Sequence, residues 1–373
     1  MSSLVKRASL ALVLAAVVGC AAIVDLPDLQ APPAGAQQDG GAEAACSPAA
    51  GTSNIVVSPR SIHTAVDKTD VYFTRADPPR DSAVLRCAKC GCDKPTELAK
   101  LNQPGGIAVD DSAVFWTDSQ DDGSLNRMDK KDPSIRQQVK GQESPIGVAV
   151  DDTYVYWTVI GGGPMGVATA GVYRAKKDDL SEVTKLAKSG TLPDDIVPYA
   201  IAVDDTYVYY TTAPDLNETD AMQPCNDKYG TVRRVKKTGG LQTSTVVVSG
   251  QPCPLGLALS DDAIYWVNLG AGKELAGTLW TKPKNAGSPL QLQGALGRPT
   301  SLTLHAGRLS WNVPANQRVE TCTAPACTDV ATLAPDQTNP SGLSSDDSGI
   351  YWAVLGSAAQ NFNDGAVRRA SPP

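Results

Sequence analysis

The chain has 373 residues, of which 42% are hydrophobic and 20% are charged, and its formal net charge is −7 at neutral pH. An acidic chain has no net basic field to attract phosphates, so a nucleic-acid partner is disfavoured. Beyond residue 50 the chain is long enough to bury one large core, and no later apolar run predicts a membrane crossing.

Residues 1–19 are typical of an export signal. Lys6 and Arg7 supply a positive start, and residues 8–18 form an apolar run that is too short to remain as a membrane-spanning helix. We therefore exclude this segment from the fold.

The apolar run ends in Val17-Val18-Gly19-Cys20, which resembles the lipobox of bacterial lipoproteins. The resemblance implies that Cys20 is acylated, becomes the first residue of the mature chain and anchors it to a membrane. The residue after the cysteine is alanine and not the aspartate of some inner-membrane lipoproteins, which favours the outer membrane. A plain signal peptide that is cleaved elsewhere is the alternative.

Residues 20–50 are rich in Ala, Pro, Gly and Gln and contain almost no large apolar residue after Leu29. Such a segment cannot bury enough surface to offset the cost of ordering. We predict a flexible lipidated tether over 20–50 and a folded domain over 51–373.

An internal repeat organises this domain. In six copies a proline precedes an aromatic residue by twelve positions: Pro104 and Trp116, Pro145 and Trp157, Pro198 and Tyr210, Pro254 and Trp266, Pro299 and Trp311, Pro340 and Trp352. A degenerate seventh copy spans 61–73, with two extra residues after Pro59. Each copy reads as an apolar strand, a turn that usually carries Asp, and a second strand rich in aromatic and β-branched residues.

Further strands follow each hairpin. Third strands are predicted at 83–86, 124–128, 171–175, 231–235, 278–281 and 365–369. Fourth strands are predicted at 97–99, 136–139, 183–186, 246–248, 290–292 and 330–333. Units of four strands with aromatic residues every 41 to 56 positions are typical of propeller blades, so the fold class is all-β, a seven-bladed β-propeller of four-stranded antiparallel blades.

The two ends of the domain predict how the ring closes. The last unit stops after its third strand, whereas residues 52–58 match 243–249, the fourth-strand region of an earlier unit. We expect the N-terminal strand to complete the last blade, which removes an open sheet edge.

The second strands also carry a family resemblance. Phe115-Trp-Thr-Asp118 and Tyr156-Trp-Thr158 resemble the YWTD repeats of low-density-lipoprotein-receptor propellers and, more loosely, NHL and TolB-type propellers. The nearest likeness is to uncharacterised bacterial lipoproteins that carry such repeats. YWTD propellers have six blades, so the resemblance implies the fold and no ligand, and the aromatic residues are predicted to pack between blades.

Eight cysteines remain after Cys20, an even number that in an exported chain indicates disulfides. Equal spacing within their units predicts Cys87–Cys92 and Cys322–Cys327. Cys225 and Cys253 fall on one face of a propeller, and the last pair is then Cys46–Cys90, which would lock the ring closure. The alternative is a metal cluster at Cys87, Cys90 and Cys92 with His63 as the nearest fourth ligand.

One face is predicted to hold the Asp turns and the turns between third and fourth strands. The tether enters the domain on this face, so we expect this face to point toward the membrane. The latter turns contain Lys130-Lys131, Lys176-Lys177, Lys236-Lys237 and Lys282. An acidic ring inside a basic ring could bind calcium or anionic head groups. The alternative is turn chemistry with solvated charge.

The opposite face is built from long, variable loops, where recognition usually lies. Candidate contacts there form an acidic set suited to a cation or a basic patch: Asp215, Glu218, Asp220, Asp227, Asn361 and Asp364. Neither His63 nor His305 has a catalytic constellation in local sequence, so no catalytic residue is assigned.

The predicted function is a lipid-anchored envelope or surface protein that binds an envelope protein or a glycan through this loop-rich face. A divalent-metal-dependent hydrolase or lyase with carboxylates at the channel mouth is the alternative, and a purely structural role is a third. No cofactor is predicted, with calcium left open.

Overall fold

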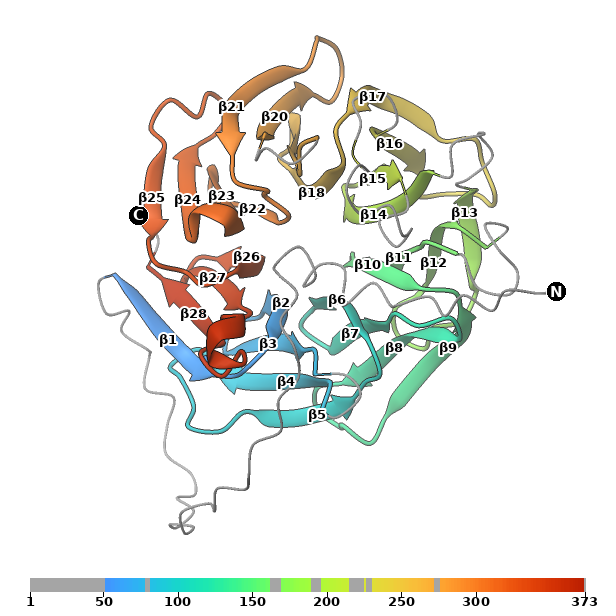
Figure 1. Ribbon diagram of the computed structural model, residues 1–373. Helices are drawn as coiled ribbons and strands as arrows, with labels where there is room; N and C mark the ends of the chain where they lie inside the picture. The colour runs from blue at the N-terminus through green and yellow to red at the C-terminus, as the bar shows by residue number, and fades with distance from the viewer. Residues whose placement is uncertain are drawn as a thin grey trace, which may run out of the picture.

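The computed structural model describes residues 51–77, 81–161, 169–188, 196–214, 225, 230–271 and 276–371. They form seven four-stranded antiparallel sheets that stand around a central axis (Figure 1). The predicted seven-bladed β-propeller is therefore confirmed. The described residues contain no helix long and apolar enough to cross a membrane.

The strands fall into four sets by their place in each blade. The first, innermost strands are β2 (Ser61–Val66), β6 (Pro104–Val109), β10 (Pro145–Val150), β14 (Ile196–Val203), β18 (Pro254–Leu259), β22 (Leu302–His305) and β26 (Pro340–Asp346). The second strands are β3 (Asp70–Arg75), β7 (Ala113–Asp118), β11 (Tyr154–Val159), β15 (Tyr207–Pro214), β19 (Ala263–Asn268), β23 (Arg308–Val313) and β27 (Gly349–Val354). The third strands are β4 (Ala83–Ala88), β8 (Gly123–Asp129), β12 (Gly171–Lys176), β16 (Gly230–Lys236), β20 (Gly277–Pro283), β24 (Arg318–Thr323) and β28 (Ala366–Ala370). The outermost strands are β5 (Thr96–Lys100), β9 (Arg136–Gln142), β13 (Thr184–Lys188), β17 (Thr245–Gln251), β21 (Leu290–Leu296), β25 (Ala331–Ala334) and β1 (Thr52–Val57).

The N-terminal strand closes the ring. β1 pairs with β28 and is the outer strand of the seventh blade, as the sequence predicts (Figure 1). Ile55 and Val56 are buried in a cluster with Tyr351 and Val367. The carbonyl of Ile55 also accepts the N–H of Cys92 in blade 1 at 3.1 Å, so one short strand joins the last blade to the first.

The repeated aromatic residues lie in the core between blades. Trp157, Trp266, Trp311 and Trp352 have no exposed surface, and each belongs to a cluster that contains residues of an adjacent blade or of its own outer strands. Both faces of every blade must be covered in a closed ring, which explains why the second strands are buried along almost their whole length and do not alternate between buried and exposed residues.

In blades 2 and 3 the threonine that follows the repeat aromatic residue ties neighbouring blades together. The Thr158 hydroxyl accepts the Gly147 N–H of its own blade and donates to the Tyr199 carbonyl of the next, both at 2.8 Å. Thr117 does the same between Gly106 and Ile146. In these two blades the hydroxyl thus bonds to the backbone at the bulge of the innermost strand.

The prediction missed one strand. No third strand was expected in the unit of Trp311, yet β24 occupies that place. The polar sequence of β24 does not indicate a buried strand, yet Val319 to Cys322 are all buried. Glu320 is accommodated there because it accepts the Trp311 indole N–H at 3.0 Å.

Candidate functional site

Short turns lie on one face of the ring and longer connections on the other. The turn face holds the connections from first to second and from third to fourth strands, and the loop face holds the rest, because consecutive strands of each blade are antiparallel. Each face carries a different set of polar side chains.

Aspartates on the turn face are held by their own turns. Asp151 accepts the N–H groups of Thr153 and Tyr154 at 2.8 and 2.7 Å, and its second oxygen lies 2.5 Å from Nζ of Lys237 in the next blade. Burial alone would raise the pKa of the Asp151 carboxyl, but Lys237 and the two backbone donors outweigh burial and lower that pKa. The carboxylate is therefore committed to the fold.

The same inter-blade ion pair recurs at five junctions of the ring. The pairs are Lys130–Asp67, Lys177–Asp110, Lys237–Asp151, Lys284–Asp204 and Lys89–Asp346. The other two junctions lack this pair. Between blades 5 and 6, Ala324 takes the place of the lysine, and between blades 6 and 7 the His305 ring lies 2.8 Å from Asp347.

These pairs correct the predicted charge pattern. Lys282 was expected in the basic ring, but it contacts only the Pro283 carbonyl, and Lys284 makes the ion pair. Lys89 was not singled out. The inner carboxylates pair directly with the lysines at five of the seven junctions, and the described residues contain no group of three or more metal-ligating side chains.

The loop face contains the predicted contact residues. Asp215, Glu218, Asp220 and Asp227 lie outside the described residues. Asn361 and Asp364 lie in the connection between β27 and β28, which contains the 3-10 helix η3 (Ala358–Gln360). Asp364 accepts the Ser357 N–H at 2.7 Å and so shapes the loop, whereas Asn361 is exposed.

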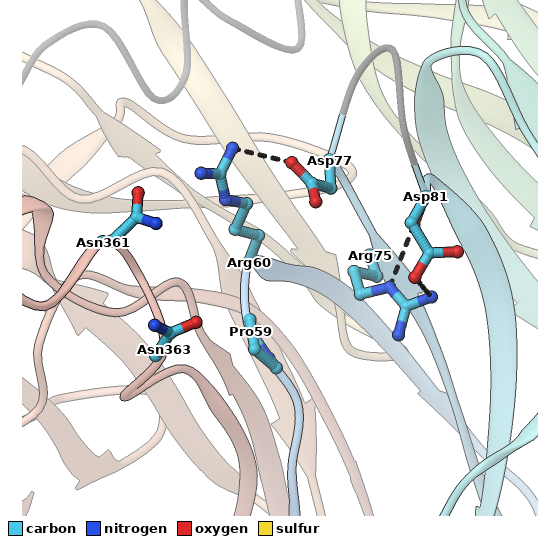
Figure 2. Close-up of a pocket in the computed structure, with 7 residues that line it drawn as sticks. All are labelled: Pro59, Arg60, Arg75, Asp77, Asp81, Asn361 and Asn363. Carbon is cyan, nitrogen blue, oxygen red and sulfur yellow. Dashed lines mark hydrogen bonds and ion pairs between the residues drawn. The ribbon is translucent and has the colours of Figure 1, made fainter. Parts of the chain in front are cut away.

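Asn361 lines a polar cavity of about 220 Å³ where blade 7 meets blade 1, which we call the ring-closure cavity. Figure 2 shows Asn361 and Asn363 on one side of Arg60, with Arg75 and Asp81 on the other. Pro59 and Asp77 complete the lining. The residues come from three connections that ring closure brings together.

Two ion pairs set the electrostatics of this cavity. Arg60 Nη1 lies 2.9 Å from Asp77 Oδ1, and Arg75 binds Asp81 through Nη2 at 2.5 Å and through Nε to its carbonyl at 3.0 Å. Arg60 also lies over the Phe362 ring at 4.8 Å. Two cations and two anions balance, so the cavity is rich in hydrogen-bonding groups and has no net charge.

Sequence reasoning assigned none of Arg60, Arg75, Asp77 and Asp81. The available signal was the irregular first unit, with its two extra residues after Pro59. These residues meet Asn361 only because the ring closes.

Disulfides support the loop and turn regions. Cys87–Cys92, Cys225–Cys253 and Cys322–Cys327 are bonded in the pairs that the sequence predicts. Cys90 is also disulfide-bonded, and its expected partner Cys46 lies outside the described residues, as does Cys20. The alternative metal cluster at Cys87, Cys90 and Cys92 is wrong because these sulfurs are used in disulfides.

Neither histidine belongs to a catalytic constellation in the described residues. His63 is half-buried in β2, and its imidazole makes no hydrogen bond there. His305 contacts Asp347, whose side chain is fully exposed on the turn face.

No protein-family model and no curated protein matches the chain. Among solved structures it is similar to virginiamycin B lyase from Staphylococcus aureus, with 15% identity over 86% of this chain and 98% of the lyase and a TM-score of 0.61. It is also similar to hydrazine synthase from Kuenenia stuttgartiensis, with 13% identity over 84% of this chain and 96% of that chain and a TM-score of 0.62. At these identities the likeness shows the β-propeller fold alone.

Proposed function

We propose that the chain is a lipid-anchored envelope or surface protein that binds a partner protein or glycan through its loop face. The ring-closure cavity is the contact point that we assign on the described part of this face. A propeller supplies a rigid platform, and recognition on such platforms usually belongs to the connections between strands.

Backbone geometry at the cavity is the observation that carries this proposal. Asn361 and Phe362 have φ values of 50° and 62°, a region that bulky residues seldom adopt, whereas the φ of 58° at Arg60 recurs before the first strand of other blades, at Ser144, Cys253, Arg298 and Asn339. Arg60 is fixed there by two hydrogen bonds, from its N–H to the Leu355 carbonyl at 3.1 Å and from the Ala76 N–H to its own carbonyl at 3.0 Å. Strained residues that the surroundings hold in place gather at binding sites, because they present side chains in a fixed direction.

The chemistry of the cavity indicates what it binds. Arginine donates, carboxylate accepts, and the asparagine amides do both, so a neutral group with several hydroxyls or amides would be satisfied. An apolar cavity of roughly 150 Å³ holds benzene, so 220 Å³ suits one sugar ring or one polar side chain of a larger partner. No observation on the described residues favours the metal-dependent hydrolase or lyase.

Capture from an isolated envelope fraction tests the proposal. The exported protein would be compared with the double variant Asn361→Gly/Asn363→Ala, whose two side chains are exposed, because glycine keeps the left-handed φ of 50° at residue 361 without strain. We expect the double variant to retain less than a tenth of the captured partner, protein or glycan.

Asp111→Ala is the matched control, because Asp111 is a highly exposed residue on the turn face. It should capture as much partner as the parent protein. Equal capture by the double variant, or capture of nothing by the parent, would contradict a binding role for this cavity.

A further inference from the structure

Three junctions of the ring carry a reciprocal latch on the turn face. An arginine on the third strand of one blade donates to the backbone carbonyl of a lysine in the next blade. The side chain of that lysine forms an ion pair with an aspartate of the first blade. The arginine contacts are Arg174 to Lys237, Arg234 to Lys284 and Arg369 to Lys89. Each latch places a guanidinium group between two neighbouring blades.

Arg86 occupies the latch position of blade 1 but forms no latch. It lies opposite Tyr72 in the strand ladder, as Arg174 lies opposite Tyr156 and Arg234 opposite Tyr209. In the described parts of the chain, however, its guanidinium makes no hydrogen bond and no ion pair. All five donors of this side chain therefore remain available.

One difference between Arg86 and the latch arginines lies in the neighbouring residue of the second strand. Arg174 and Arg234 each stack over a tyrosine ring at 4.5 Å, and the ladder places those tyrosines, Tyr154 and Tyr207, where blade 1 has Asp70. Arg86 lacks this platform, although Arg369 forms its latch with Gly349 at the same position of blade 7, so the missing ring alone does not decide whether a latch forms.

The open latch leaves a groove of about 140 Å³ between blades 1 and 2, which we call the rim groove. Lys130 and Arg136 line it beside Arg86, while Tyr72, Leu98 and Met128 supply a buried apolar floor. Arg136 donates to the carbonyls of Pro133 and Leu98, which fixes its guanidinium at the groove. Glu97 also lines the groove, but it lies opposite Leu85 in the ladder and makes no ion pair with Arg86.

We propose that the rim groove binds an oxyanion on a short apolar stem, with the anion on Arg86 and the stem on the floor between Tyr72 and Met128. Guanidinium groups prefer the paired oxygens of a carboxylate or a phosphate ester. The site lies on the outer rim, away from the loop face, and is independent of the function proposed above.

Methyl NMR of the exported protein labelled at its methionines tests the site directly. The chain has only four methionines, and Met128 lies on the groove floor, so its methyl signal, assigned with Met128→Leu, reports occupancy. Benzoate should shift this signal saturably with a dissociation constant of about 1 mM, which is typical of a fragment of this size. Benzamide, its uncharged counterpart, should bind at least tenfold more weakly. Phenyl phosphate distinguishes the two head groups when it is compared with benzoate at about pH 5, where both carry a single negative charge, because the second charge of its dianion would tighten binding at any cationic site.

Two arginine variants separate binding from stability. Arg86→Gln should weaken benzoate at least tenfold and leave the melting temperature unchanged, since Arg86 holds nothing in the fold. Arg174→Gln should keep the benzoate affinity and lower the melting temperature, since it breaks a latch. An unmoved Met128 signal, equal binding of benzamide, or full binding by Arg86→Gln would overturn the proposal.

Discussion

His63 occupies a position where the other six blades have a residue no larger than serine. The strand ladder and the hydroxyl contacts match it to Gly106, Gly147, Ala200, Gly256, Ser301 and Gly342. Burial without a hydrogen-bond partner disfavours the charged imidazole and lowers the pKa of His63 from 6.5 to about 4.

The first prediction concerns acid stability. In the unfolded chain His63 takes up a proton below pH 6.5, whereas the folded protein does so only near pH 4, so stability present above pH 6.5 is lost as the pH falls through this window. We expect the free energy of unfolding to fall by about 1 to 2 kcal/mol between pH 7 and pH 5 through this residue. Urea unfolding of His63→Ser, which copies blade 6, should lack that fall, and a pH dependence equal to that of the parent would refute the assignment.

A glutamine before the repeat proline is a further part of the motif in three blades. The indole N–H groups of Trp157, Trp266 and Trp352 donate to glutamines that precede each repeat proline by three positions: Gln142, Gln251 and Gln337. Leu101 stands at that position before Pro104, and the Trp116 indole N–H has no partner. The sequence therefore held a longer motif than the interval from proline to aromatic.

At the scale of the strand, the inter-blade threonines are the motif residues whose side chains hydrogen-bond to the backbone of two blades. Blades 5 and 7 have Val267 and Ala353 in the corresponding place, and blade 6 uses Asn312, which accepts from Ser301 and donates to the Pro340 carbonyl. The bridge is thus a recurring solution and not a requirement of every junction.

The second prediction measures one such bridge. Thr158→Val keeps the shape of a fully buried side chain but removes the hydroxyl that accepts the Gly147 N–H and donates to the Tyr199 carbonyl. Leaving buried polar groups unpaired costs roughly 2 to 4 kcal/mol here, which urea unfolding would measure. Thr153→Val changes an exposed threonine in the adjacent turn and should cost less than about 0.5 kcal/mol. Equal effects of the two variants would count against the bridge.

Strands could be predicted from the sequence where their buried residues are apolar. The hairpins of each repeat and six of the third strands were evident from β-branched and aromatic runs, but β24 was not, because Glu320 and Thr321 read as exposed. The lysine ring was partly visible from the Lys-Lys pairs, whereas the partner of each lysine lies in another blade and depends on how neighbouring blades are rotated.

At the scale of the whole molecule, closure decides both the fold and the candidate site. The match between residues 52–58 and 243–249 predicted β1, and with it the seventh blade. The ring-closure cavity could not be predicted in the same way, because Arg60 and Asn361 are separated by almost the whole domain and meet only after β1 pairs with β28. Loop conformation, including the left-handed residues at the cavity, follows from those contacts and not from local sequence.

The third prediction tests whether the ring unfolds as one unit. Ile55→Ala removes a buried side chain from β1 and should lower the free energy of unfolding by about 2 to 4 kcal/mol. Val57→Ala, two residues on, changes a side chain that is 63% exposed and should have almost no effect. Because β1 contacts both blade 7 and blade 1, we expect Ile55→Ala to keep a single unfolding transition at a lower urea concentration, by tryptophan fluorescence and circular dichroism alike. If the two probes separated into two steps, blade 7 would be opening ahead of the rest, and the ring would be a chain of semi-independent blades that β1 holds shut.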